Sequence, residues 1–300
     1  MRNTTKPGAG RTGLEPQNEL EHLLAALIRV TNAQAGTDAG DDQRLLDAEG
    51  LIVKFVGHVS SAVVLSRGTN IPQLRIAFFD PGSVNGLVRA AVETFLVFHY
   101  VFVSPSSPEE ADARYLSWWL GGLIDRQGFP LHSPAGEKLL EQEAAEAEGL
   151  RRRLEANAAF GDLSETQRRQ ILRGSWRAGP EGRDVSWRDM AINAGLNEDS
   201  ASGLYRFLCG YAHSSWISVL QVRQARTAED QRGLMAASLS YLAGIIAHMT
   251  RSVCHVFAKA REALVADAGA EELVEKWTYV VSTNEGLDID WSRSGFGNDT

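Results

Sequence analysis

The segment from Val84 to Val103 is apolar on every side, and it constrains the fold more than any other part of the sequence. Its second half, FLVFHYVFV, could be a strand by residue propensity alone. The preceding GLVRAAVE favours a helix, and the two halves together predict one continuous helix. A helix without a polar face must be covered by other helices, so we expect it at the centre of a bundle.

Apolar residues recur at helical spacing in several other segments, which predicts an all-α fold, a multi-helix bundle. No internal repeat and no strand pair with a hairpin turn is evident, although WTYVV near 277–281 could be a stray strand. The expected helices are 17–33, 42–67, 84–103, 108–127, 135–159, 164–174, 186–195, 198–222 and 228–266.

Composition along the chain predicts one folded unit with loose ends. Residues 1–16 are rich in Gly, Pro and Thr and are expected to be disordered, and the Gly- and Asp-rich residues 283–300 are expected to form a flexible tail. Residues 17–282 are then a single α-helical domain, with a helical insertion at about 105–180.

Charge and cysteine content indicate a cytoplasmic protein. The net charge is −8, which gives no field to draw the whole surface to nucleic acid or an anionic membrane, although a local basic patch is compatible with it. Cys209 and Cys254 lie in apolar helical patterns without a CxxC motif, so neither a disulfide framework nor a zinc site is indicated. The first residues do not resemble a signal peptide.

The uninterrupted apolar runs are short. Those at 95–103 and 236–246 fall below the roughly 18 residues that a membrane-spanning helix needs. We therefore expect no membrane anchor.

Arg89 and Glu93 are the opposite charges inside the apolar segment. Their spacing of four places them on one helical face, where they can pair. They would form either a structural ion pair, because charges are rarely buried unpaired, or the lining of a polar pocket in which Arg89 holds an anion. His99 is about 240° further round the helix and is expected on another face.

The stretch YRFLCGYAHSSW, residues 205–216, is the second candidate site. Arg206 and His213 are seven residues apart, about 340° of helical rotation, so they would lie nearly in line. Gly210 falls between them and would allow a ligand or another backbone to approach. The aromatic residues around this stripe are Tyr205, Tyr211 and Trp216. The alternative is a well-packed aromatic helix with a satisfied histidine.

His248, Arg251 and His255 share one face of the last long helix. No carboxylate lies on that face to complete a metal site, so we expect a solvated or partner-facing stripe and no bound metal. Gly-rich phosphate loops and nucleophile elbows are missing from the sequence, and no cofactor is expected.

The segment WRDMAINAGLNEDSASGLYR has the spacing of a helix-turn-helix motif. Such a motif would place its second helix, from about Glu198, in the major groove of DNA. Glu198 and Asp199 would then face phosphates, which bind Lys and Arg, so DNA binding is not favoured.

Two resemblances add to these patterns. LVRAAVETFLVFHYVF at 87–102, followed downstream by LYRFLCGYAHSSW at 204–216, resembles a bacterial family of all-helical proteins of unknown function over about residues 45–260. Arg206 and His213 also resemble the Arg-x(4–6)-His signature of the HEPN superfamily. That resemblance implies a small helical bundle that usually dimerises, and often a metal-independent ribonuclease of toxin or phage-defence systems. Phe207 stands where that superfamily usually has a polar residue, which puts catalysis in doubt.

Three functional classes follow. The first is a non-catalytic interaction or sensing module, with Arg89, Glu93, Tyr205, Tyr211 and Trp216 as binding residues. The second is a HEPN-like ribonuclease, in which His213 transfers a proton and Arg206 stabilises the charged phosphorane. The third is a DNA-binding regulator.

The partners that we expect are a second copy of the chain and an RNA or a protein. The homodimer follows from the HEPN resemblance and from the helix at 135–159, which has few apolar positions.

Overall fold

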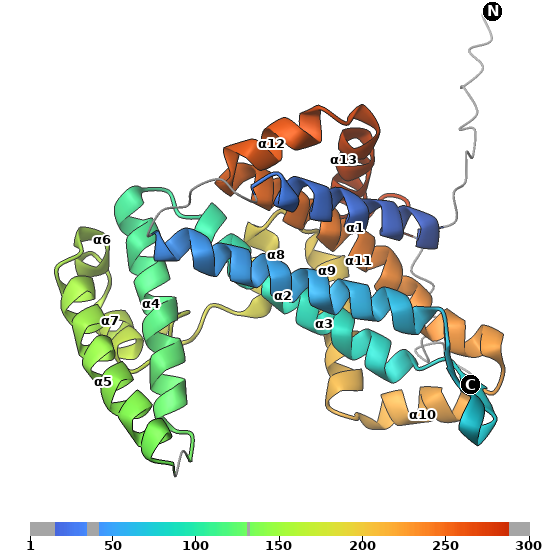
Figure 1. Cartoon of the computed structure of the whole chain (residues 1–300), viewed down its shortest axis with the longest axis horizontal. Helices are drawn as coiled ribbons and strands as arrows, with labels where there is room; N and C mark the ends of the chain where they lie inside the picture. Colours follow the sequence, from blue (N-terminus) through green and yellow to red (C-terminus); the bar gives the residue numbers. More distant parts are fainter. Residues whose placement is uncertain (1–15, 35–41, 131–132, 288–300) are drawn as a thin grey trace, which may run out of the picture.

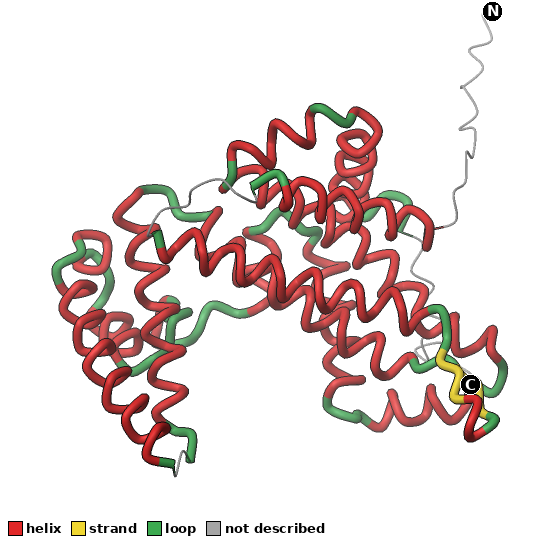
Figure 2. The backbone as a smooth tube through the Cα atoms, viewed as in Figure 1, coloured by secondary structure: helices red, strands yellow, loops and turns green. Residues whose placement is uncertain are grey.

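The computed structural model describes residues 16–34, 42–130 and 133–287, and this part of the chain is an all-α bundle, as predicted (Figures 1 and 2). Of the segments predicted to be disordered or flexible, 1–15 and 288–300 lie outside the described residues. The helices before the central one are α1 (Pro16–Asn32) and α2 (Gln43–Ser66).

The apolar segment forms α3 (Pro81–Phe98), and its last turns continue as the π-helix η2 (His99–Val103). Asp80 caps α3, since its side chain accepts a hydrogen bond from the Ser83 backbone N–H. α3 packs mainly against α2, α11 (Ala228–Val256) and α9 (Glu198–Ala212). Phe95 and Phe98 have no exposed surface, which confirms the predicted central position of this helix.

Residues of the expected insertion form an arm at one side of the bundle (left in Figure 1). It contains α4 (Pro108–Gln127), α5 (Pro134–Glu155), α6 (Ala158–Gly161), α7 (Glu165–Leu172) and the 3-10 turn η3 (Pro180–Gly182). α4 packs on α5, α6 and α7, and the buried Leu150, Leu154 and Phe160 of the arm join the same hydrophobic core as the rest of the bundle.

The remaining helices complete the bundle. α8 (Trp187–Asn193) packs on α9, and α10 (Trp216–Gln224) packs on the end of α9. α12 (Ala258–Val265) and α13 (Ala268–Thr283) pack on α11 and on α1, so the first and last helices of the described chain lie together. This arrangement covers the face of α11 that α3 does not reach.

Two helix predictions were wrong because the chain breaks where we expected continuity. The helix expected at 198–222 stops at Ala212, Ser214 adopts a left-handed φ of 51°, and the Ser215 side chain caps α10. The helix expected at 228–266 breaks at Phe257, whose backbone is extended and whose ring is buried.

Two strand predictions also need correction. WTYVV at 277–281 lies within α13, because Val274, Trp277 and Val281 are buried at helical spacing and Asp267 caps the helix. The hairpin that the sequence did not reveal consists of β1 (Thr69–Ile71) and β2 (Ile76–Phe78), joined by the 3-10 turn η1 (Pro72–Leu74). Such short strands carry too little alternation to be recognised.

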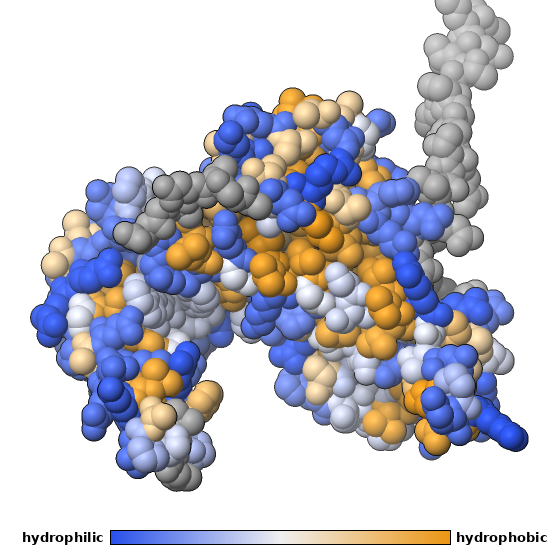
Figure 3. All heavy atoms as spheres, viewed as in Figure 1, coloured by the Kyte–Doolittle hydropathy of each residue, from blue (hydrophilic) through white to orange (hydrophobic). Residues whose placement is uncertain are grey.

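Apolar side chains remain exposed along α2, where Leu46, Val53 and Val64 are 45%, 69% and 60% exposed; Figure 3 shows this apolar band across the front of the molecule. By length and composition alone, α2, the continuous α3–η2 segment and α11 would each be able to cross a membrane. The mean hydropathy of these helices thus meets a criterion that the length of the uninterrupted apolar runs does not. The absence of a membrane anchor stays a prediction.

The contact between α11 and α13 depends on Gly244. A Cβ atom placed there would lie 2.0 Å from Cγ1 of Val281. We predict that Gly244→Ala lowers the free energy of unfolding by about 1–3 kcal/mol, because overpacking forces the two helices apart. Urea denaturation measures this change. Gly233→Ala is the matched control, because its Cβ meets open space in the same helix and should stabilise by up to about 1 kcal/mol. Equal stability of the two variants would contradict this packing.

Candidate functional site

Arg89 on α3 is the centre of a polar cluster between α3 and α9. Its Nε donates to Oε1 of Glu93 at 3.0 Å, and its Nη1 lies 3.2 Å from Nε2 of His213. The Tyr205 hydroxyl donates to the same Glu93 oxygen at 2.8 Å, and the guanidinium stands over the Tyr205 ring at 5.8 Å. The structure thus confirms the Arg89–Glu93 pair, at the edge of the core and with 20% and 27% of the side chains exposed.

The cluster limits what His213 can do. Arginine has only donors, so Nε2 of His213 must accept, and its ring proton then resides on Nδ1. The exposed His213 is the C-cap of α9 and is held by Arg89. In the described part of the chain, the exposed Arg206 side chain forms no hydrogen bond, ion pair or ring contact. The structure therefore gives His213 a guanidinium partner from α3 and not from Arg206.

The other aromatic candidates point elsewhere. Tyr211 is buried against Phe207, its hydroxyl has no hydrogen-bond partner among the described residues, and burial raises its pKa to about 12. Trp216 begins α10 and is 72% exposed. Of the predicted binding residues, the cluster contains Arg89, Glu93 and Tyr205.

A second polar site is a cavity of about 380 Å³ between η2, α11 and α13. His99 reaches it from η2, His248, Arg251 and His255 reach it from α11, and α13 adds hydroxyl groups. The remaining described lining residues are Val103, Ala194, Gly195, Ser252, Thr278 and Ser282. None of these described lining residues is acidic.

The cavity has a buried part and an open part. His248 is 8% exposed, and its Nε2 lies 3.3 Å from the Ser282 hydroxyl. Arg251 and His255 are exposed. The expected solvated stripe on α11 is thus wrong for His248, because the stripe turns inward where α13 and the turn at Gly195 cover it.

Burial and neighbouring cations keep the inner imidazoles neutral. The pKa of His99 falls to about 4, chiefly through burial and then through Arg114 and His255. The pKa of His248 also falls to about 4, through burial and then through Arg251 and His99. Both rings are therefore uncharged at neutral pH and can each offer one donor and one acceptor.

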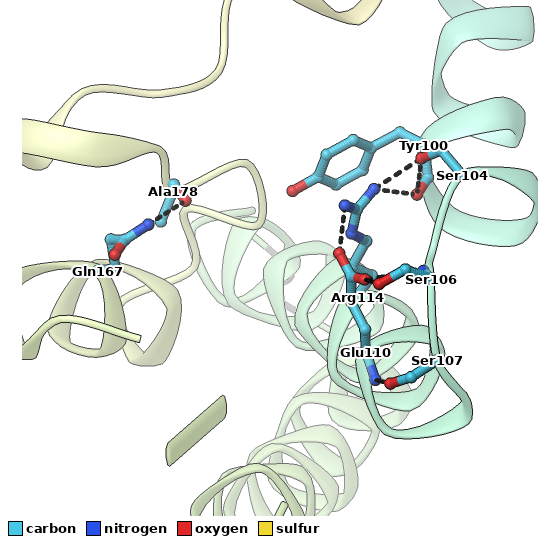
Figure 4. Close-up of polar contacts among 8 residues, drawn as sticks. All are labelled: Tyr100, Ser104, Ser106, Ser107, Glu110, Arg114, Gln167 and Ala178. Carbon is cyan, nitrogen blue, oxygen red and sulfur yellow. Dashed lines mark hydrogen bonds and ion pairs between the residues drawn. The ribbon is translucent and has the colours of Figure 1, made fainter. Parts of the chain in front are cut away.

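The π-helix that carries His99 is held by Arg114 of α4 (Figure 4). Nη1 of Arg114 donates to the Tyr100 carbonyl oxygen at 3.0 Å and to the Ser104 hydroxyl at 2.7 Å, while Nη2 pairs with Glu110. Glu110 in turn accepts from the backbone and hydroxyl of Ser106. π-helical turns are frequent at functional sites, and this network fixes the one that reaches the cavity.

The sequence pattern predicts that the cavity residues of α11 lie together, but it does not predict the residues that other helices contribute. His248, Arg251 and His255 share a face of one helix, so their pattern was visible. His99 joins them only because α3 packs against α11, and Ser282 only because α13 folds back. Among the described residues, no three His, Cys, Asp or Glu side chains are placed to hold a metal ion.

The helix-turn-helix segment is packed as part of the bundle. Glu198 pairs with Arg188 of α8, and Leu204 and Leu208 of α9 are fully buried against the core. One face of α9 is thus committed to the core, and the sequence-based expectation that this motif does not bind DNA stays a prediction.

Comparison with known proteins places these features in a family. A family model described as a family of unknown function, DUF5677, matches residues 55–231, more than half of the chain. The chain belongs to this family. No curated protein and no solved structure matches it.

The DUF5677 match confirms the resemblance to an uncharacterised family and carries no activity. It includes the Arg89 cluster and η2, whereas His248, Arg251 and His255 lie beyond its end. The HEPN resemblance stays a prediction.

Neutral, buried histidines predict a specific pH dependence of stability. In the unfolded chain both imidazoles return to a pKa near 6.5 and bind protons that the folded state excludes below that pH. Stability should therefore be complete above about pH 6.5 and fall as the pH drops toward 4, by at most about 3 kcal/mol per histidine. Urea midpoints between pH 4 and 7.5 measure the slope.

The variants His99→Gln and His248→Gln isolate this effect from that of the carboxylates. Each should flatten the dependence of unfolding free energy on pH relative to the unaltered protein. An unchanged slope in both variants would contradict the burial of these rings.

Proposed function

We propose that this protein is a non-catalytic sensing module that binds a small anion in the cavity between η2, α11 and α13. The observation that carries the proposal is the convergence of His99, His248, Arg251 and His255 on one cavity whose described lining contains no carboxylate. The volume, about 380 Å³, lies in the range of small-molecule sites.

The chemistry of the lining favours an anion. Arg251 is permanently charged and its fork matches carboxylate or phosphate oxygens. The hydroxyls of Ser252 and Ser282 add hydrogen-bond donors, whereas the Thr278 hydroxyl already donates to the Val274 carbonyl oxygen at 2.7 Å. A bound anion would also favour the protonated imidazoles, so binding should take up protons.

Binding is favoured over catalysis by the properties of the best catalytic pair in the cavity. The Ser282 hydroxyl and His248 lie 3.3 Å apart, as a nucleophile and base would. A base with a pKa of about 4 is poorly matched to removing a hydroxyl proton at neutral pH. A neutral imidazole can still donate one hydrogen bond to an anion, and the charge of the bound anion then favours protonation of the ring.

Sulfate is a suitable probe because it stays doubly charged while the histidines titrate. We predict one saturable sulfate site, with affinity higher at pH 5.5 than at pH 8 because the bound anion favours protonation of His99 and His248. Equilibrium dialysis with radiolabelled sulfate at constant ionic strength measures both. Arg251→Met should weaken binding at least tenfold.

Arg223→Met is the matched control, since this exposed arginine lies on α10 and not in the cavity lining. It should bind sulfate like the unaltered protein. Absence of saturable binding at millimolar sulfate, or equal weakening by the two variants, would exclude the anion site.

A HEPN-like ribonuclease is the second candidate, favoured by one observation: His213 is exposed and carries a guanidinium beside it. The cation is Arg89 instead of Arg206, and its donated hydrogen bond occupies Nε2 of His213. For this ring to act as a base, Arg89 would first have to move to a phosphate.

Our proposal predicts no His213-dependent cleavage of RNA. The assay incubates purified protein with tRNA, mRNA and rRNA in EDTA, beside His213→Ala and Arg89→Met. Cleavage by the unaltered protein that disappears in His213→Ala would establish the ribonuclease instead. The sulfate experiment is independent of that result, because its residues lie in the other site.

A further inference from the structure

Three tryptophans meet in a cleft of about 360 Å³ between α2, α4 and the loop that follows α7. Trp118 and Trp119 come from α4, and Trp176 comes from the loop. The other described lining residues are Gln43, Asp47, Gly122, Leu123, Asp125 and Arg126. This cleft takes no part in the proposed anion site.

The third indole is held in place by several contacts. Gly121 of α4 lets the loop approach so closely that a Cβ atom would lie 2.8 Å from the Gly174 carbonyl oxygen and 3.2 Å from the Trp176 ring. Tyr100 packs edge-on against Trp176 with ring centroids 5.7 Å apart. Gln167 donates to the Ala178 carbonyl oxygen at 3.5 Å and holds the loop from α7 (Figure 4). Trp176 is thus held against α4 by its ring contacts and by the close approach of its loop.

Two carboxylates of the cleft favour a cation, and one cation from outside the cleft lining, the Arg177 guanidinium, already stands over the Trp176 ring, 5.3 Å from its centroid. Asp47 accepts hydrogen bonds from the neutral Tyr115 hydroxyl at 2.7 Å and from Gln43 at 3.0 Å, and no described cation pairs with Asp47 or Asp125. The lining cation Arg126 pairs with Glu143 at 2.8 Å. The nearby Arg44 pairs with Asp112.

We propose that the cleft of Trp118, Trp119 and Trp176 binds an alkylated ammonium group, with Asp47 and Asp125 balancing its charge. Indole faces attract cations more strongly than other aromatic rings do, and alkyl substituents on nitrogen add apolar contact with the same faces. Asp47 and Asp125 place negative charge beside the rings. Such a group occurs on small quaternary amines and on methylated lysine side chains, and the two sources are distinguished by experiment.

Choline is the probe for a free amine, and 3,3-dimethylbutan-1-ol is its uncharged analogue of the same shape. We expect calorimetry and quenching of tryptophan fluorescence to show saturable choline binding at least tenfold tighter than that of the alcohol. A short peptide with one trimethyllysine, beside the unmodified peptide, tests the second source. Binding of either cation supports the site, and the tighter one identifies the source.

Gly122 offers a variant that closes the cleft. It lines the cleft and a Cβ atom added there meets no other atom within 4 Å, so Gly122→Leu should fill the space without disturbing α4. Gly233→Leu makes the same change at an open position of α11. Binding should be lost in the first variant, retained in the second, and weakened at least tenfold in Asp125→Asn.

The outcomes decide the proposal. Equal affinity for choline and its uncharged analogue would show a merely apolar cleft and overturn it. Unchanged binding in Gly122→Leu would place the ligand elsewhere. Failure of the unaltered, folded protein to bind choline and the trimethyllysine peptide at millimolar concentration would also overturn it.

Discussion

Burial of an apolar helix on all of its faces is the constraint on which the rest of this structure depends. Exposing any face of α3 to water would cost free energy because every face carries apolar side chains. α2, α9 and α11 therefore surround it. Its buried polar residues Asn85 and Thr94 bond to backbone carbonyls, whereas its charged residues lie where the cover is incomplete. Arg89 and Glu93 emerge beside α9, and His99 emerges beside α11. Both polar sites therefore arise at gaps in the cover of one helix.

The two sites differ in how their charges are balanced. In the first, Glu93 satisfies Arg89 and accepts from Tyr205, so the guanidinium is already neutralised by its own protein. In the second, burial keeps His99 and His248 uncharged, and Arg251 has no described carboxylate beside it in the lining. The Arg89–Glu93 ion pair stabilises the packing of the protein, whereas Arg251 retains a positive charge that an anionic ligand can neutralise. This contrast is why the second site, and not the first, carries the proposed function.

The sequence predicted what depends on local pattern and missed what depends on distant contacts. The position of α3 and the Arg89–Glu93 pair followed from spacing within one helix. The chain breaks at Ser214, and this break places His213 at the end of a helix. The signal for it in the sequence is Ser215, which caps α10, but the surrounding apolar residues favour a continuous helix. WTYVV became a helix because burial against α11 outweighs the strand propensity of its residues. His99 and Ser282 joined the cavity through contacts that no spacing encodes.

The π-helical turn also has a consequence for chain length. In η2 the Ser104 N–H bonds to the His99 carbonyl, five residues back, where an α-helix would reach back four. A homologue that lacked one residue here could form an uninterrupted α-helix, but each following side chain would then be turned by about 100° relative to α3. Arg114 could then no longer donate hydrogen bonds to both the Tyr100 carbonyl oxygen and the Ser104 hydroxyl. The number of residues between α3 and Pro105 thus distinguishes relatives that can form this π-helical turn, and with it the cavity, from those that cannot.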